Sequence, residues 1–119
     1  MESILTSVKE GIGVGADCEA FDKILIMHIN TVFALLKRMG VGPKEGFRID
    51  GKKNTWDEFI DDDSDSTLEA AKSYVTLKVN IVFDPPASAT LLEAMKEAIK
   101  ELEWSLNFEA DVLADSEGG

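Results

Sequence analysis

The feature that most constrains the fold is the segment from Asp17 to Arg38, which contains neither glycine nor proline. Its apolar residues recur every three or four positions, as one face of an α-helix requires. The main stripe consists of Phe21, Leu25, His28, Val32 and Leu36. Asp17 is a good N-cap, and Gly40 follows the last turn. The sequence therefore predicts a helix at 17–39 that is apolar enough to lie in the centre of a core.

Four further segments are predicted to be helical, at residues 3–10, 56–60, 67–83 and 88–108. Ile4, Val8 and Ile12 are spaced four apart, which is typical of a helix. The second and third segments each begin with a capping box, at Thr55–Glu58 and Ser66–Glu69.

The last predicted helix, at 88–108, follows Asp84-Pro-Pro86, where proline stops the helix before it. It carries a seam with heptad-like spacing, formed by Leu92, Met95, Ile99, Leu102 and Leu106. We expect this seam to pack against the helices at 17–39 and 67–83. The expected fold class is all-α, with four to five helices.

Residues 40–55 contain several glycines, Pro43 and an Asp50-Gly51 turn signal. They are predicted to form a short hairpin or an irregular excursion, and a protruding loop of this kind often carries function. The expected organisation is a single helical domain at 1–108 and an acidic C-terminal tail at 109–119.

The charge balance excludes several partners. Twelve Lys and Arg residues stand against 23 Asp and Glu residues, a net charge of −11, and we expect no basic stripe. Such a surface offers no counterion-release affinity for nucleic acid. No run of 18 apolar residues predicts a membrane span. The single Cys18 cannot form an internal disulfide. The expected partners are proteins.

The glycine-rich stretch Gly11-Ile-Gly-Val-Gly15 invites a phosphate-binding interpretation. A dinucleotide fingerprint needs a preceding strand and a later acidic residue, and a P-loop ends in Gly-Lys-Ser or Gly-Lys-Thr. The chain has neither pattern here, because a helical segment precedes Gly11. We therefore predict a helix C-cap followed by a loose joint.

Other candidate chemistry is equally weak. Asp61–Asp65 resembles the start of a calcium loop, but Ser66 stands at the glycine position and Lys72 at the glutamate position. His28 has no His, Cys or Asp at ligand spacing and is interpreted as a core residue. We expect no catalytic residue, no metal and no cofactor.

Apolar residues exceed what a chain of this length easily buries, which is typical of a protein that assembles. The candidate interface residues are Ile4, Val8, Phe47, Ile49, Trp104, Phe108, Val112 and Leu113.

Most of the chain, from about Ile4 to Asn107, resembles the small head–tail connector proteins of long-tailed bacteriophages, also called adaptor or head-completion proteins. The resemblance is carried by "DKILIMHINTVFALLKRMGVGPKEGFRI", by Tyr74-Val-Thr-Leu-Lys78, by Phe83–Ser88 and by Glu103-Trp104. It implies a structural virion neck protein without catalysis. It further implies a ring, typically of twelve copies, that binds the portal above and a stopper or tail-completion protein below.

In that setting DNA is passing cargo in a channel, there is no membrane, and the protein is made in the bacterial host cytoplasm. Two alternatives remain open. One is a small helical regulatory or scaffold protein that works as a dimer. The more remote one is a metal-dependent nucleotide pyrophosphohydrolase, for which the sequence contains Glu19-x-x-Asp22 and Glu58-x-x-Asp61 but no Glu-x-x-Glu.

Overall fold

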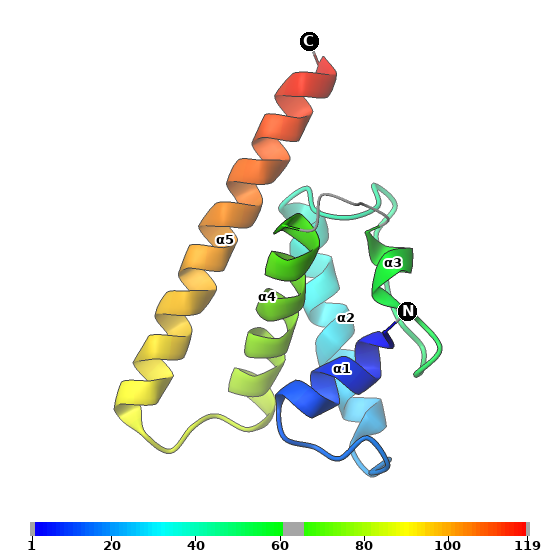
Figure 1. The fold of residues 1–119 in the computed structure, drawn as a ribbon, viewed down its shortest axis with the longest axis vertical. Coiled ribbons are helices and arrows are strands. Elements are labelled where there is room, and N and C mark those ends of the chain that lie inside the picture. The colour runs from blue at the N-terminus through cyan, green and yellow to red at the C-terminus, as the bar shows by residue number, and fades with distance from the viewer. Residues whose placement is uncertain (1, 61–65, 119) are drawn as a thin grey trace.

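A computed structural model describes the backbone of residues 2–60 and 66–118, and their side chains up to Asn107 apart from Ser66. In chain order the helices are α1 (Ile4–Gly11), α2 (Asp22–Arg38), α3 (Trp56–Phe59), α4 (Ser66–Phe83) and α5 (Ala89–Gly118). α5 packs on α4, α4 packs on α2, and α1 contacts both α2 and α4 (Figure 1). The predicted all-α class is confirmed, since the described residues form no strand beyond an isolated bridge between Ser3 and Thr55.

The first two helices end in the same way. At the end of α1 the N–H of Val14 donates to the Lys9 carbonyl and that of Gly13 to the Glu10 carbonyl. Gly13 has φ +83°, so this is a Schellman motif with glycine at its left-handed position. Val41 and Gly40 repeat the motif at the end of α2. The predicted glycine caps are confirmed, but the joint after α1 is closed by hydrogen bonds and is not loose.

α2 begins at Asp22, five residues later than predicted, and Asp17 is not its N-cap. Residues 16–21 form turns, in which the N–H of Cys18 donates to Gly15 and that of Asp22 to Glu19. The buried Lys9 ammonium binds both the Ala16 carbonyl and the Asp22 carboxylate. This contact between α1 and α2 holds the connection in turns, so the helix starts only at Asp22.

Of the two structures predicted for residues 40–55, a short hairpin or an irregular excursion, the chain forms the irregular excursion. The segment is held to α2 by Asn30, whose amide takes the place of a strand partner. Its Nδ2 donates to the Ile49 carbonyl at 2.9 Å, and its Oδ1 accepts from the Ile49 N–H at 2.7 Å. Both backbone groups of a residue buried in the core are thereby satisfied.

α1 and α3 are distant in sequence but are joined in the fold. The indole Nε1 of the buried Trp56 donates to Ser7 Oγ at 2.8 Å, and the Ile4 N–H donates to the Asn54 carbonyl at 3.0 Å. The predicted capping box is present at α3, where Glu58 accepts from the Thr55 N–H at 2.7 Å.

α4 and α5 pack antiparallel along the predicted seam (Figure 1). Met95, Ile99 and Leu106 are buried there, and Leu92 and Leu102 are half-buried. The Tyr74 hydroxyl donates to Glu103 at 2.8 Å and links the two helices beside the seam.

α5 is longer than predicted, because it continues as one helix from Ala89 to Gly118. A helix of 30 residues is about 45 Å long at 1.5 Å per residue. No glycine or proline occurs between Ala89 and Gly118. The predicted end at 108 is therefore wrong, and the C-terminal part of α5 extends past the start of α4 (Figure 1).

Candidate functional site

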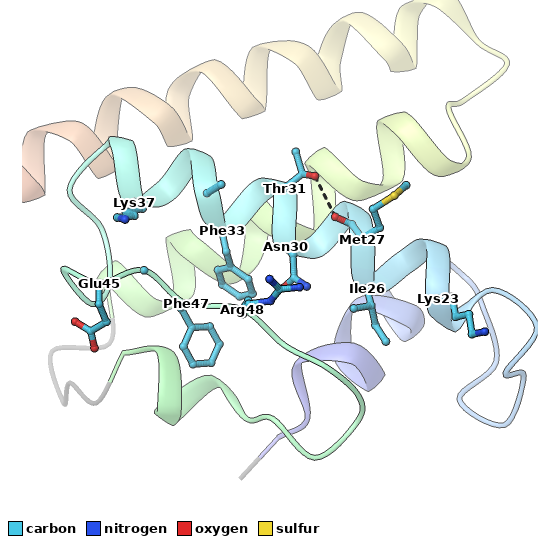
Figure 2. A pocket seen from close by; sticks show the side chains of 12 residues that line it. Lys23, Ile26, Met27, Asn30, Thr31, Phe33, Lys37, Glu45, Phe47 and Arg48 are labelled. Atoms are coloured by element: carbon cyan, nitrogen blue, oxygen red, sulfur yellow. Dashed lines mark hydrogen bonds between the residues drawn. The ribbon is translucent and has the colours of Figure 1, made fainter.

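An open groove of about 770 Å³ lies between α2 and the loop residues 45–48 (Figure 2). We call it the α2 groove. Its floor is aromatic and aliphatic. The Phe33 ring is buried beneath it, with its centroid 5.2 Å from Phe47 and 4.6 Å from Phe59. Ile26 and Met27 continue the apolar lining along α2.

The shape of the α2 groove depends on how the loop is anchored. The Asn30–Ile49 hydrogen bonds fix the loop one residue beyond Arg48. At its other end, the Gly46 N–H donates to the Pro43 carbonyl at 3.0 Å, and Gly46 has φ +91°. An added Cβ at Gly46 would lie 3.1 Å from Lys37 Cδ, so glycine lets the loop approach α2 closely.

The rim of the α2 groove is basic. Lys23 lies at one end, Lys37 at the other, and Arg48 between them on the loop (Figure 2). Glu45 is the only acidic residue in the lining. Among the described residues, none of the three cations takes part in an ion pair.

This local charge corrects the expectation that the chain has no basic stripe. Residues 23–53 contain seven Lys or Arg residues and two acidic residues, a net charge of +5, whereas the remainder of the chain carries −16. The whole-chain sum conceals this segregation. Counting charge in a sliding window along the sequence would have revealed it, but the groove itself depends on the tertiary placement of the loop.

Large apolar side chains are also exposed at the end of the bundle where α2 and α5 begin and α4 ends (Figure 1). They are Phe21 just before α2, Ile24 and Met27 in the first turns of α2, Val82 near the end of α4 and Leu91 near the start of α5, and we call this set the apolar end. Phe21 also contacts Phe83 edge-on, with ring centroids 5.2 Å apart. Phe21 was predicted to belong to the buried stripe of α2, but the buried face is made by Leu25, Ile29, Val32, Phe33 and Leu36. The buried face of α2 is therefore rotated relative to the predicted stripe, because α4 and the loop cover the side of the helix that carries Ile29 and Phe33.

The predicted interface residues are dispersed. Ile4, Val8 and Ile49 are buried in the core, so the structure assigns them a packing role within one chain. Phe47 is half-buried in the α2 groove, and Trp104 is 70% exposed on α5. Phe108, Val112 and Leu113 belong to α5, but their side chains lie outside the described part. Contact of any of these residues with a second chain stays a prediction.

The described residues contain no group of three or more His, Cys, Asp and Glu side chains that could hold a metal ion. The possible calcium segment Asp61–Asp65 lies outside the described residues. His28 and Cys18 are each half-buried, without a partner that would activate them among the described side chains. Burial, together with the hydrogen bond and the charge of Glu103, raises the pKa of Tyr74 well above its usual value. No helix within the described ranges is both long and apolar enough to cross a membrane.

Comparison with known proteins gave one match. A family model with the description "Phage connector protein" matches residues 4–112, from the first residue of α1 into the C-terminal part of α5. No curated protein and no solved structure matches the chain.

Proposed function

The chain belongs to the phage connector protein family, and from this premise we propose that it forms an oligomeric ring between the portal and the tail or stopper of the virion. The family is a structural one, so the protein is a connector of the phage neck that assembles with other virion proteins. The observation that carries the proposal is the extent of the family match, which includes α1 to α4 in full and α5 as far as residue 112.

Exposed apolar side chains support assembly. At the apolar end, Met27, Val82 and Leu91 are each more than half exposed. Large side chains of this kind, gathered at one end of a bundle, are typical of protein–protein contact surfaces. We propose that the apolar end meets a neighbouring protein of the neck.

In this proposal the protein acts without catalysis and is made in the host cytoplasm. The ring extends the DNA channel, and DNA passes through it as cargo. The net charge of −11 suits a wall that does not hold DNA, because like charges repel the phosphate backbone. A ring of about twelve copies is the expected order, taken from the resemblance to head–tail adaptor proteins.

The test is native mass spectrometry or mass photometry of the full chain, alone and then with the portal protein encoded by the same phage. We expect a discrete species of about twelve copies, formed alone or only when portal is present. A stable two-fold dimer that ignores portal would contradict the proposal and favour the dimeric regulatory alternative. Magnesium-dependent hydrolysis of a nucleoside triphosphate would contradict the non-catalytic role.

A further inference from the structure

Charge is segregated along this chain. Residues 23–53 carry a net charge of +5. Beyond Lys100 the sequence contains six acidic residues and no Lys or Arg, and it includes the apolar residues Phe108, Val112 and Leu113. The basic and the acidic segments are complementary in sign, and each also carries apolar residues.

The two segments do not lie together in one chain. α5 packs against α4, and the α2 groove opens on the side of α2 that faces the loop and α3 (Figure 2). Figure 1 likewise shows α5 and the loop on opposite sides of α4. The end of α5 extends beyond the bundle, so it is available to a neighbouring molecule.

We propose that the α2 groove receives the acidic C-terminal end of α5, residues 108–118, from a second copy of this chain. This inference rests on the proposed ring. Lys23, Lys37 and Arg48 attract the carboxylates, and the floor made by Phe33 and Phe47 takes up apolar side chains. An amphipathic helix lying in an apolar groove with a charged rim is a recurrent mode of recognition.

The symmetry of this contact matches its role. Donor and acceptor are different surfaces of the same chain, so the contact is heterologous and propagates from subunit to subunit. A head-to-tail contact of this type closes into a ring when its rotation permits, whereas a two-fold contact stops at a dimer. The charge segregation therefore gives each subunit one acidic end to offer and one basic groove to fill.

The test uses charge reversal on each side of the contact in the full chain. The groove variant carries Lys37→Glu and Arg48→Glu, and the helix variant carries Asp111→Lys and Asp115→Lys. The control variant, Lys52→Glu with Lys53→Glu, makes the same change in net charge as the groove variant, at two exposed loop residues outside the groove. Circular dichroism checks that each variant is folded. Assembly is measured by native mass spectrometry in the condition that yields the wild-type ring, alone or with portal.

We expect the groove variant and the helix variant each to lose assembly, with subunit association weakened by about a hundredfold or more. The control variant keeps the ring. Mixing the groove variant with the helix variant restores assembly, because each then offers the other a complementary partner. Higher salt weakens the wild-type ring, since the contact is partly electrostatic.

The outcomes separate this inference from the proposed function. A wild-type ring that survives both reversals would overturn the inference and leave the ring itself established. If the groove variant keeps the ring but loses binding to duplex DNA, the α2 groove is a nucleic-acid binding site and the inference is equally overturned. A wild-type chain that forms no ring, with or without portal, would overturn the proposed function and this inference with it.

Discussion

Lys9 Nζ lies 2.8 Å from Asp22 Oδ1 and spans the whole connection between α1 and α2. The lysine is only 3% exposed, and its ammonium also donates to the Ala16 carbonyl at 3.2 Å. One buried ammonium group therefore binds both the segment that follows the glycines, at Ala16, and the first residue of α2, Asp22. This contact turns a sequence with three glycines in five residues into a defined connection.

Replacing Lys9 with methionine tests the importance of this ion pair. Methionine keeps an apolar stem of similar length but removes the charge, which leaves Asp22 and the Ala16 carbonyl without their donor. We expect Lys9→Met to lower the free energy of unfolding by about 1–3 kcal/mol, as measured by urea denaturation.

The matched control for this substitution is Lys100→Met. Lys100 faces Glu97 at 3.8 Å on the surface of α5, with 73% of its side chain exposed. An exposed pair of this type contributes little, so we expect a change within about 1 kcal/mol. Equal effects of the two substitutions would show that the buried pair has no special role.

The single tyrosine of the chain provides a test at alkaline pH. Desolvation by burial, followed by the hydrogen bond and the charge of Glu103, raises the pKa of Tyr74 in the folded chain. The unfolded state therefore ionises first, and stability is fully present below about pH 10 and falls as the pH rises above it. Because no other tyrosine is present, tyrosinate absorbance during titration reports on Tyr74 alone.

The control for the alkaline titration is Tyr74→Phe. This substitution removes the ionisable group and the bond to Glu103 but keeps the ring in the core. We expect it to cost about 1–2 kcal/mol at neutral pH and to flatten the loss of stability above about pH 10. If Tyr74→Phe loses as much stability above about pH 10 as the wild type does, the alkaline loss of stability does not come from ionisation of Tyr74.

Ser7 is expected to stabilise the fold through Trp56. Its Oγ accepts the indole N–H at 2.8 Å, and the tryptophan is buried. Ser7→Ala leaves that donor unsatisfied, which costs about 1–3 kcal/mol. Thermal unfolding measures the effect. Ser73→Ala on the exposed face of α4 is the control, with an expected change within about 0.5 kcal/mol.

Two glycines should respond to alanine in opposite ways. Gly42 has φ +91°, and an added Cβ would collide with the Phe59 ring, so Gly42→Ala should destabilise the fold by about 1–3 kcal/mol. Gly15 has open space around it and no positive φ, so Gly15→Ala should stabilise by about 0.4–1 kcal/mol. Urea denaturation measures the free energy of unfolding of both variants. A destabilised Gly15→Ala would contradict the interpretation that Gly15 has room for a side chain.

Local signals in the sequence predicted most of the elements. Each helix found was anticipated, and the ends of α1 and α2 lie at the expected glycines. The start of α2 was missed because it depends on Lys9, a residue thirteen positions away. The end of α5 was placed too early because the acidic segment was interpreted as a tail, although no breaker interrupts it.

By itself, the sequence determined the all-α class, the helical periodicity, the caps and the likeness to phage connectors, because these depend on neighbours within a few positions along the chain. Only the tertiary structure decided which apolar residues are buried and which remain exposed, as with Phe21 and Ile4. It also created the α2 groove, because Asn30 binds the backbone of Ile49 across nineteen positions and so places Arg48 opposite α2. Local propensity carries no information about such a contact, since its free energy exists only when distant segments meet.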